Sequence, residues 1–209
     1  MKPPDNNPHS LRPGLFVLNL CFFRKFATYL FSYEQAVELL YGEVATGKQT
    51  AEMVGPPLVF LMRHSLELGY KYTVFELYRL NPSDYGPDDF NRSVDRFSHT
   101  LSKWHHELKD AYEKIAERFE VSDDERADFA NHYEKTRVGM EEFERLDKGS
   151  YSFRFPIERK TGKLIWSHDD TVDLLGLKNL FDQAMILLRH TTDVLSPYQE
   201  MMDGIGDGE

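Results

Sequence analysis

The chain has 209 residues, of which 41% are hydrophobic and 13% aromatic, enough to build one sizeable core. Its formal net charge is -10, and residues 81–209 contain 17 Lys or Arg against 28 Asp or Glu. An acidic surface repels phosphates at long range. We therefore expect no bulk DNA binding, and any contact with RNA requires a local basic pocket.

The single cysteine, Cys21, excludes an internal disulfide and a Cys-based metal site, and it favours a reducing, cytoplasmic location. The most apolar stretch, LFVLNLCFF (15–23), is followed at once by Arg24 and Lys25. It is far shorter than the roughly 20 residues of a membrane span. It also lacks the basic start and the cleavage site of a secretory signal. We expect a soluble protein with no membrane partner.

Residues 1–14 are rich in proline and predict a flexible arm, whereas residues 199–209 predict a flexible acidic tail. Residues 15–198 between them predict one helical domain. Its first helix is expected over about 17–42, where apolar residues recur at helical spacing and Gly42 offers a stop. A second helix is expected from about Pro57 to Leu80, because prolines suit a first helical turn.

The third predicted helix covers about residues 89–119, with a possible break near Ser98. Ser122 and Glu125 have the spacing of a capping box, which predicts a fourth helix that continues to about residue 147.

The pattern then changes, and residues 151–167 alternate around a turn at Thr161-Gly162, which predicts a short β-hairpin. Asp170 or Thr171 is expected to cap a last long helix that ends near residue 195. The chain is therefore predicted to be mostly all-α, an up-down bundle of about five long helices with one short hairpin.

Three charged residues form one row on the second predicted helix: Arg63, Glu67 and Lys71, each four residues from the next. Residues at this spacing are neighbours on a helix face, so the three can pair in sequence. The other rows of the helix are apolar or small, so this charged row is expected to lie against another helix, where an unpaired charge is costly. Two interpretations remain open. The row is an internal support, or one of its cations is free to bind a phosphate or a carboxylate.

Three motifs occur in an order that resembles the HEPN superfamily, especially its nucleotidyltransferase-associated branch. Glu67 and Lys71 lie in RHSLELGYK, His99 lies in SHTLSKW, and Arg154 lies in YSFRFP. They correspond to that branch's Glu-x-x-x-Lys helix, its helix opened by Thr-His-x-Leu and its Arg-Tyr-Pro element. The chain also resembles uncharacterised bacterial proteins with an Arg-His-x-Leu-Glu-Leu helix. The resemblance covers roughly residues 25–195 and implies a HEPN-like bundle.

The resemblance further implies a function in a bacterial defence or toxin–antitoxin system, acting on RNA or sensing a nucleotide, with a homodimer or another protein as partner. It implies a polar centre around the bundle made of Arg63, His64, Glu67, Lys71 and Arg154.

Catalytic members of the superfamily resemble one another in an Arg followed, after about four to six residues, by a His, and they cleave RNA without a metal. Two pairs here have such spacing: Arg92 with His99, and Arg126 with His132. A His can move the 2′-hydroxyl proton while an Arg stabilises charge on the phosphorane. The alternative function is a non-catalytic protein-interaction module that uses its acidic surface or an exposed aromatic patch.

Two other residue patterns lack the arrangement that a metal site or a phosphate-binding loop requires. His105 and His106 are adjacent, so they cannot present two metal ligands on one helix face. The stretch GEVATGKQT (42–50) carries Gln49 where a phosphate-binding loop needs Ser or Thr. We expect no metal and no cofactor.

Overall fold

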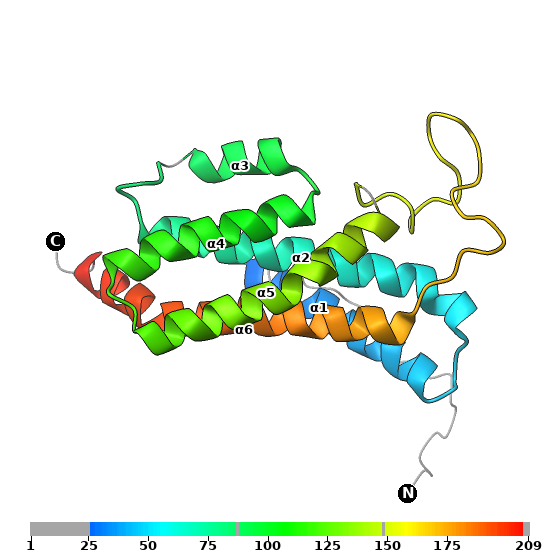
Figure 1. The fold of residues 1–209 in the computed structure, drawn as a ribbon, viewed down its shortest axis with the longest axis horizontal. Coiled ribbons are helices and arrows are strands. Elements are labelled where there is room, and N and C mark those ends of the chain that lie inside the picture. Colours follow the sequence, from blue (N-terminus) through cyan, green and yellow to red (C-terminus); the bar gives the residue numbers. More distant parts are fainter. Residues whose placement is uncertain (1–25, 87, 148, 207–209) are drawn as a thin grey trace, which may run out of the picture.

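The computed structural model describes residues 26–86, 88–147 and 149–206. These residues fold mainly into helices and include no β-strand, so the all-α prediction is confirmed. The helices are shown in Figure 1 and are α1 (Phe26–Ala45), α2 (Ala51–Leu80), α3 (Asp89–Phe97), α4 (Leu101–Arg118), α5 (Asp123–Leu146) and α6 (Leu174–Gly206).

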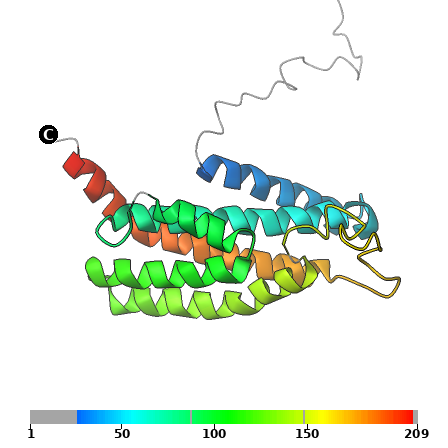
Figure 2. The same cartoon turned by 90° about the horizontal axis from the view of Figure 1, so that it is seen from above.

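Helix α2 lies at the centre of the bundle and packs against α1, α4 and α6, while α5 packs against α4 and α6. Figure 2 shows the resulting layers, with α1 on one side, α2 and α6 in the middle, and α4 and α5 on the other side. Short α3 rests on α2. The sequence explains this arrangement, because a helix that is apolar on nearly every side must be covered on nearly every side.

Gly69 of α2 lies where two helices approach each other closely. A Cβ atom at this position would lie 2.6 Å from Cδ1 of Leu188 in α6 and 3.7 Å from the side chain of Leu30 in α1. The missing side chain therefore lets α6 approach α2 directly.

Helix α2 begins at Ala51, earlier than predicted, so Pro56 and Pro57 lie inside it. A proline inside a helix cannot donate the bond to the carbonyl four residues earlier. Here the carbonyls left without that bond belong to Glu52 and Met53, which are exposed and can be hydrated. The prolines are therefore tolerated just beyond the first turn.

Other boundaries follow local signals. Helix α1 passes through Gly42 and ends at Ala45, so the glycine is not its stop. The predicted break near Ser98 is confirmed, because Ser98 has a φ of 49° and separates α3 from α4. The capping box of Ser122 and Glu125 is also confirmed at the start of α5.

The segment 151–167, predicted as a hairpin, is an irregular loop with a single antiparallel bridge between Ile157 and Leu164. The backbone N–H of Glu158 donates to the Lys163 carbonyl at 2.8 Å within this bridge. Most side chains of the loop are exposed. A two-stranded pairing without a covering layer buries too little to extend further.

Helix α6 starts after Asp173, whose Oδ1 accepts a hydrogen bond from the Gly176 N–H at 3.0 Å. The predicted cap Asp170 instead accepts from the Ser167 N–H at 2.6 Å, within the preceding loop. The helix continues to Gly206, past the predicted end near residue 195 and through part of the predicted tail at 199–209.

The predicted arm at 1–14 and the apolar stretch at 15–23 lie outside the described residues. In the part of the chain that the structure describes, no helix combines the length and the apolar character needed to cross a membrane.

One buried histidine joins three helices. Nδ1 of His105 in α4 lies 3.1 Å from the Tyr70 hydroxyl of α2, and its ring stacks on Tyr133 of α5 at 4.0 Å. The side chain is almost fully buried, and this burial lowers its pKa from 6.5 to about 4. His105 is therefore a neutral core residue.

We predict that protonation of His105 destabilises the fold. Between pH 6.5 and about 4 the unfolded chain binds the imidazole proton and the folded chain does not. The free energy of unfolding therefore falls as pH falls through this range, by up to about 3 kcal/mol. Urea denaturation across the range checks the slope. His105→Asn should reduce this pH dependence, whereas His106→Asn, at an exposed neighbouring site, should keep it.

Candidate functional site

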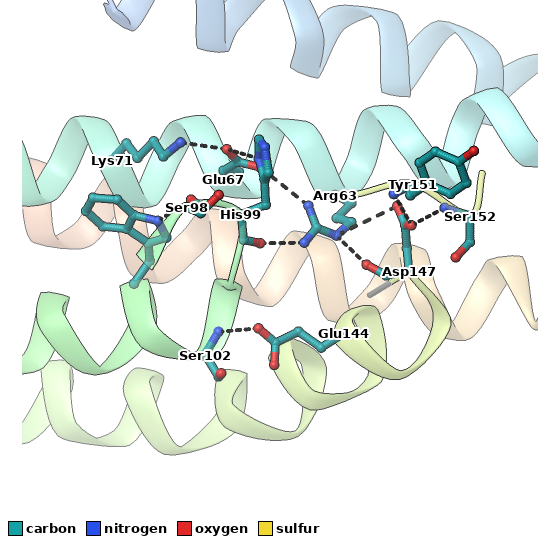
Figure 3. Close-up of polar contacts among 11 residues, drawn as sticks. Arg63, Glu67, Lys71, Ser98, His99, Ser102, Glu144, Asp147, Tyr151 and Ser152 are labelled. Atoms are coloured by element: carbon teal, nitrogen blue, oxygen red, sulfur yellow. Dashed lines mark hydrogen bonds and ion pairs between the residues drawn. The ribbon is translucent and has the colours of Figure 1, made fainter. Parts of the chain in front are cut away.

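A polar cluster surrounds the charged row of α2. Arg63, Glu67 and Lys71 come from α2, His99 comes from the corner between α3 and α4, and Asp147 follows α5. Figure 3 shows Arg63 between His99 on one side and Asp147 on the other. Three segments that are distant in sequence meet here.

Arg63 is fully buried and its guanidinium is bonded on several sides. Nη2 donates to the His99 carbonyl at 2.5 Å, and Nε donates to the Asp147 carbonyl at 3.1 Å. Nη1 donates to Oε2 of Glu67 at 3.4 Å. A ligand cannot reach this group, so Arg63 is a support.

Glu67 is the shared acceptor of the cluster and is only 3% exposed. Its carboxylate accepts from Lys71 Nζ at 2.6 Å and lies 2.9 Å from Nδ1 of His99. Burial opposes its ionisation, but the hydrogen bonds and charges of Lys71 and His99 outweigh burial and lower the pKa of the carboxyl. Glu67 is thus an anion that positions its neighbours.

His99 is the part of this cluster that solvent reaches, with 52% of its side chain exposed. Because Nδ1 faces an ionised carboxylate, we assign the proton of the neutral ring to Nδ1, which leaves Nε2 as a base. The corner is also held by Trp104, whose indole N–H donates to the Ser98 carbonyl at 3.0 Å. His99 is therefore an oriented, accessible imidazole.

Asp147 holds the turn that carries Arg154. Its Oδ1 accepts from the backbone N–H groups of Tyr151 at 2.7 Å and Ser152 at 2.6 Å. The Arg154 N–H in turn donates to the Tyr151 carbonyl at 3.1 Å. Arg63 binds the carbonyl of Asp147, so one buried cation positions both the His99 corner and the Arg154 turn.

Arg154 is exposed, and its guanidinium lies over the rings of Phe60 at 5.6 Å and Phe155 at 5.8 Å. Among the described residues it makes no ion pair with a carboxylate. Aromatic faces hold a cation without neutralising it. Arg154 therefore presents a positive charge to solvent.

His64 lies between these groups on α2. Its ring is stacked on Phe60 at 5.7 Å and meets Tyr33 edge-on at 4.6 Å. Burial lowers its pKa, Glu67 opposes that effect, and the positive charges around it, including Arg154, add to it. His64 is therefore a mostly neutral imidazole beside Arg154.

The structure does not bring Arg92 and His99 into contact. Arg92 is exposed on α3 and pairs with Asp89 in its own first turn. Helix α3 ends at Phe97, and Ser98 then redirects the chain, so His99 faces Glu67 of α2 instead.

Arg126 and His132 also point to different neighbours. Arg126 donates to the Val121 carbonyl at 3.2 Å, whereas the His132 ring lies 5.4 Å from the ring of His190 in α6. Six residues on a continuous helix correspond to a rotation of about 240°, so the two side chains leave different faces.

Two residues of the site region, Asp147 and Glu144, were not predicted from the sequence. Glu144 Oε1 accepts a hydrogen bond from the Ser102 N–H at 2.9 Å. A side chain of α5 thus satisfies a backbone donor in the first turn of α4. The only local signal was the turn-forming cluster around Asp147, because such a side chain can bond backbone groups that follow it. No group of three or more His, Cys, Asp or Glu in the described part of the chain could hold a metal ion.

Comparison of the chain with protein-family models, with curated proteins and with solved structures found no match. The interpretation of the site therefore depends on its geometry and on the motifs.

We predict that Arg63→Met lowers the free energy of unfolding by about 3–5 kcal/mol, because it removes one donor from Glu67, the donors of the His99 and Asp147 carbonyls, and the cation 3.8 Å from the buried Asp147 carboxylate. Arg137→Met is the matched control, since Arg137 forms a pair of the same spacing with Glu141 but is exposed. This control should cost at most about 0.5 kcal/mol. Urea denaturation measures both. Similar values for the two variants would contradict the supporting role of Arg63.

Proposed function

We propose that the chain is a HEPN-like helical module that binds the phosphate groups of single-stranded RNA or of a nucleotide at His99 and Arg154. The observation that carries this proposal is the exposed Arg154 guanidinium, which is held by aromatic rings and has no carboxylate partner among the described residues. A guanidinium in this state is suited to a phosphate, which it can bind through two parallel hydrogen bonds.

The local charge balance permits an anionic ligand. Three cations, Arg63, Lys71 and Arg154, stand against three carboxylates, Glu67, Asp147 and Glu144, so the site region is near neutral although the chain as a whole has a net charge of -10. Acidic surroundings repel long polyanions, so a ligand with a small footprint is favoured over a duplex.

Exposed aromatic side chains beside Arg154 favour a ligand that has bases as well as phosphates. Phe155 is 48% exposed and stacks on Tyr151 with ring centroids 4.8 Å apart. Unpaired bases stack on such rings in proteins that bind single strands. A base on Phe155 and a phosphate on Arg154 match one nucleotide unit.

His99 adds a second contact. Glu67 orients the ring through Nδ1 and leaves Nε2 toward solvent, and an imidazolium can donate from this atom to a phosphate oxygen. The resemblance of these same residues to HEPN motifs supports a place in a bacterial defence or toxin–antitoxin system. The separated Arg–His pairs support binding more than cleavage.

Removal of the Arg154 charge should weaken RNA binding. We expect Arg154→Gln to raise the Kd for a labelled single-stranded RNA about tenfold, and to reduce the salt dependence of log K by about 0.7, because one phosphate contact is lost. Fluorescence anisotropy at several salt concentrations measures both quantities. Arg145→Gln is the control, since Arg145 is also exposed but is already paired with Glu142.

Equal Kd values for the wild type, Arg154→Gln and Arg145→Gln would contradict the proposal and favour the non-catalytic protein-interaction alternative. Competition by a mononucleotide distinguishes the two sources of phosphate. Full displacement of the RNA at low mononucleotide concentration indicates nucleotide sensing, and displacement only by longer RNA indicates an RNA ligand.

A further inference from the structure

A pocket lies between the N-terminal part of α2, the start of α6 and the loop that precedes α6; we call it the loop pocket. Its volume is about 360 Å³. Pockets that bind small molecules usually measure roughly 300–1,000 Å³. The residues that line it include Glu52, Gly55, Val59, Phe153, Trp166 and Asp170. The loop pocket shares no residue with the site at His99 and Arg154, so an inference about it does not rest on the proposed function.

The floor of the loop pocket is apolar and lacks a side chain at Gly55. Val59 beside it is only 1% exposed. A Cβ atom at Gly55 would lie 3.7 Å from Cδ1 of Leu174 in α6, which is an ordinary contact distance. The space that Gly55 leaves between α2 and α6 can therefore take an apolar group of a ligand out of water.

One wall of the loop pocket is aromatic. The rings of Phe153 and Trp166 lie 5.1 Å apart at an angle of 38°, and both side chains are partly exposed. The backbone that leads into this wall is held in place, because the Ser152 N–H donates to Oδ1 of Asp147 at 2.6 Å. A wall that is formed before the ligand arrives reduces the entropic cost of binding.

Two carboxylates, Glu52 and Asp170, line the loop pocket, and its described lining residues include no Lys or Arg. Hydrogen bonds from backbone N–H groups hold the pKa of both carboxyls below its usual value, and for Asp170 the donor is Ser167 at 2.6 Å. Arg145, which acts on Asp170 from α5, is already paired with Glu142 at 2.7 Å. Both carboxylates are therefore charged at neutral pH and favour a cation.

We propose that the loop pocket binds a small organic ammonium ion, with its apolar body on the floor at Gly55 and Val59 and its charge beside the aromatic wall and the two carboxylates. Aromatic faces attract an ammonium group, and a tryptophan face does so most strongly. The carboxylates pair with the same group and repel an anion. The net charge of -10 also favours the approach of a cation over that of an anion.

The two tryptophans of the chain allow a direct test, because Trp166 lines the loop pocket and Trp104 is fully buried in the core. In the ¹⁵N-labelled full chain each indole N–H gives one NMR signal, and Trp166→Phe identifies which is which. We expect 2-phenylethylammonium to shift the Trp166 signal saturably and to leave the Trp104 signal in place. The Kd for this cation should be about tenfold lower than that for phenylacetate, an anion of similar size.

A pair of glycine variants tests the floor of the loop pocket. Gly55→Leu fills the space between α2 and α6 and should abolish the shift of the Trp166 signal. Gly42→Leu is the matched control in another helix, since a Cβ atom at Gly42 of α1 would meet no described atom within 4 Å. This control should keep the shift. Circular dichroism verifies that both variants remain helical.

A set of amide variants tests the charge and leaves the floor intact. Glu52→Gln with Asp170→Asn should raise the Kd for 2-phenylethylammonium about fivefold. Each amide keeps an oxygen that accepts the backbone hydrogen bonds, so the loop is preserved. Glu141→Gln is the control, since Glu141 is an exposed carboxylate of α5 outside the loop pocket, and it should leave the Kd unchanged.

A Trp166 signal that 2-phenylethylammonium does not shift would overturn the proposal. Equal Kd values for this cation, for phenylacetate and for neutral 2-phenylethanol would also overturn it, because binding would then depend on apolar contact alone. An unchanged Kd in the double amide variant would exclude Glu52 and Asp170 as partners of the ammonium group and would likewise contradict the proposal.

Discussion

The buried guanidinium of Arg63 is the interaction on which the candidate site depends. It joins α2 to the His99 carbonyl and to the Asp147 carbonyl, which lie 36 and 84 residues away in the sequence. A fully buried cation is stable only when its donors are paired, so the two loop carbonyls must occupy fixed positions. The loop residues around each carbonyl are therefore fixed in position as well.

Within the cluster, the buried residues support the site and the exposed residues can contact a ligand. Arg63 and Glu67 are inaccessible, whereas His99 and Arg154 are exposed on segments that these two buried residues hold in place. Side chains on loops gain precision when a rigid element fixes the loop, because their own backbone has few neighbours. The charged row thus acts mainly as the support of the site, and Glu67 also orients the imidazole that solvent reaches.

Several predictions that used only neighbouring residues agreed with the structure, whereas the Gly42 stop, the Asp170 cap and the hairpin did not. The break at Ser98 and the capping box at Ser122 depend on the local backbone, and the pairing of Glu67 with Arg63 and Lys71 depends on helical spacing. Predictions that used sequence separation to infer a contact did less well. Arg126 and His132 have a suitable separation, yet helical rotation sends them to different neighbours.

The sequence by itself determined that the protein is helical, that its second helix is apolar or small on most sides, and that the three charges of the row can pair with one another, because periodicity and spacing are properties of one helix. Only the tertiary structure decided which polar groups are buried and which meet solvent. Asp147 and His99 belong to one site because Arg63 of α2 binds the backbone carbonyl of each. Burial depends on elements that are distant in sequence, and no local pattern records how those elements meet.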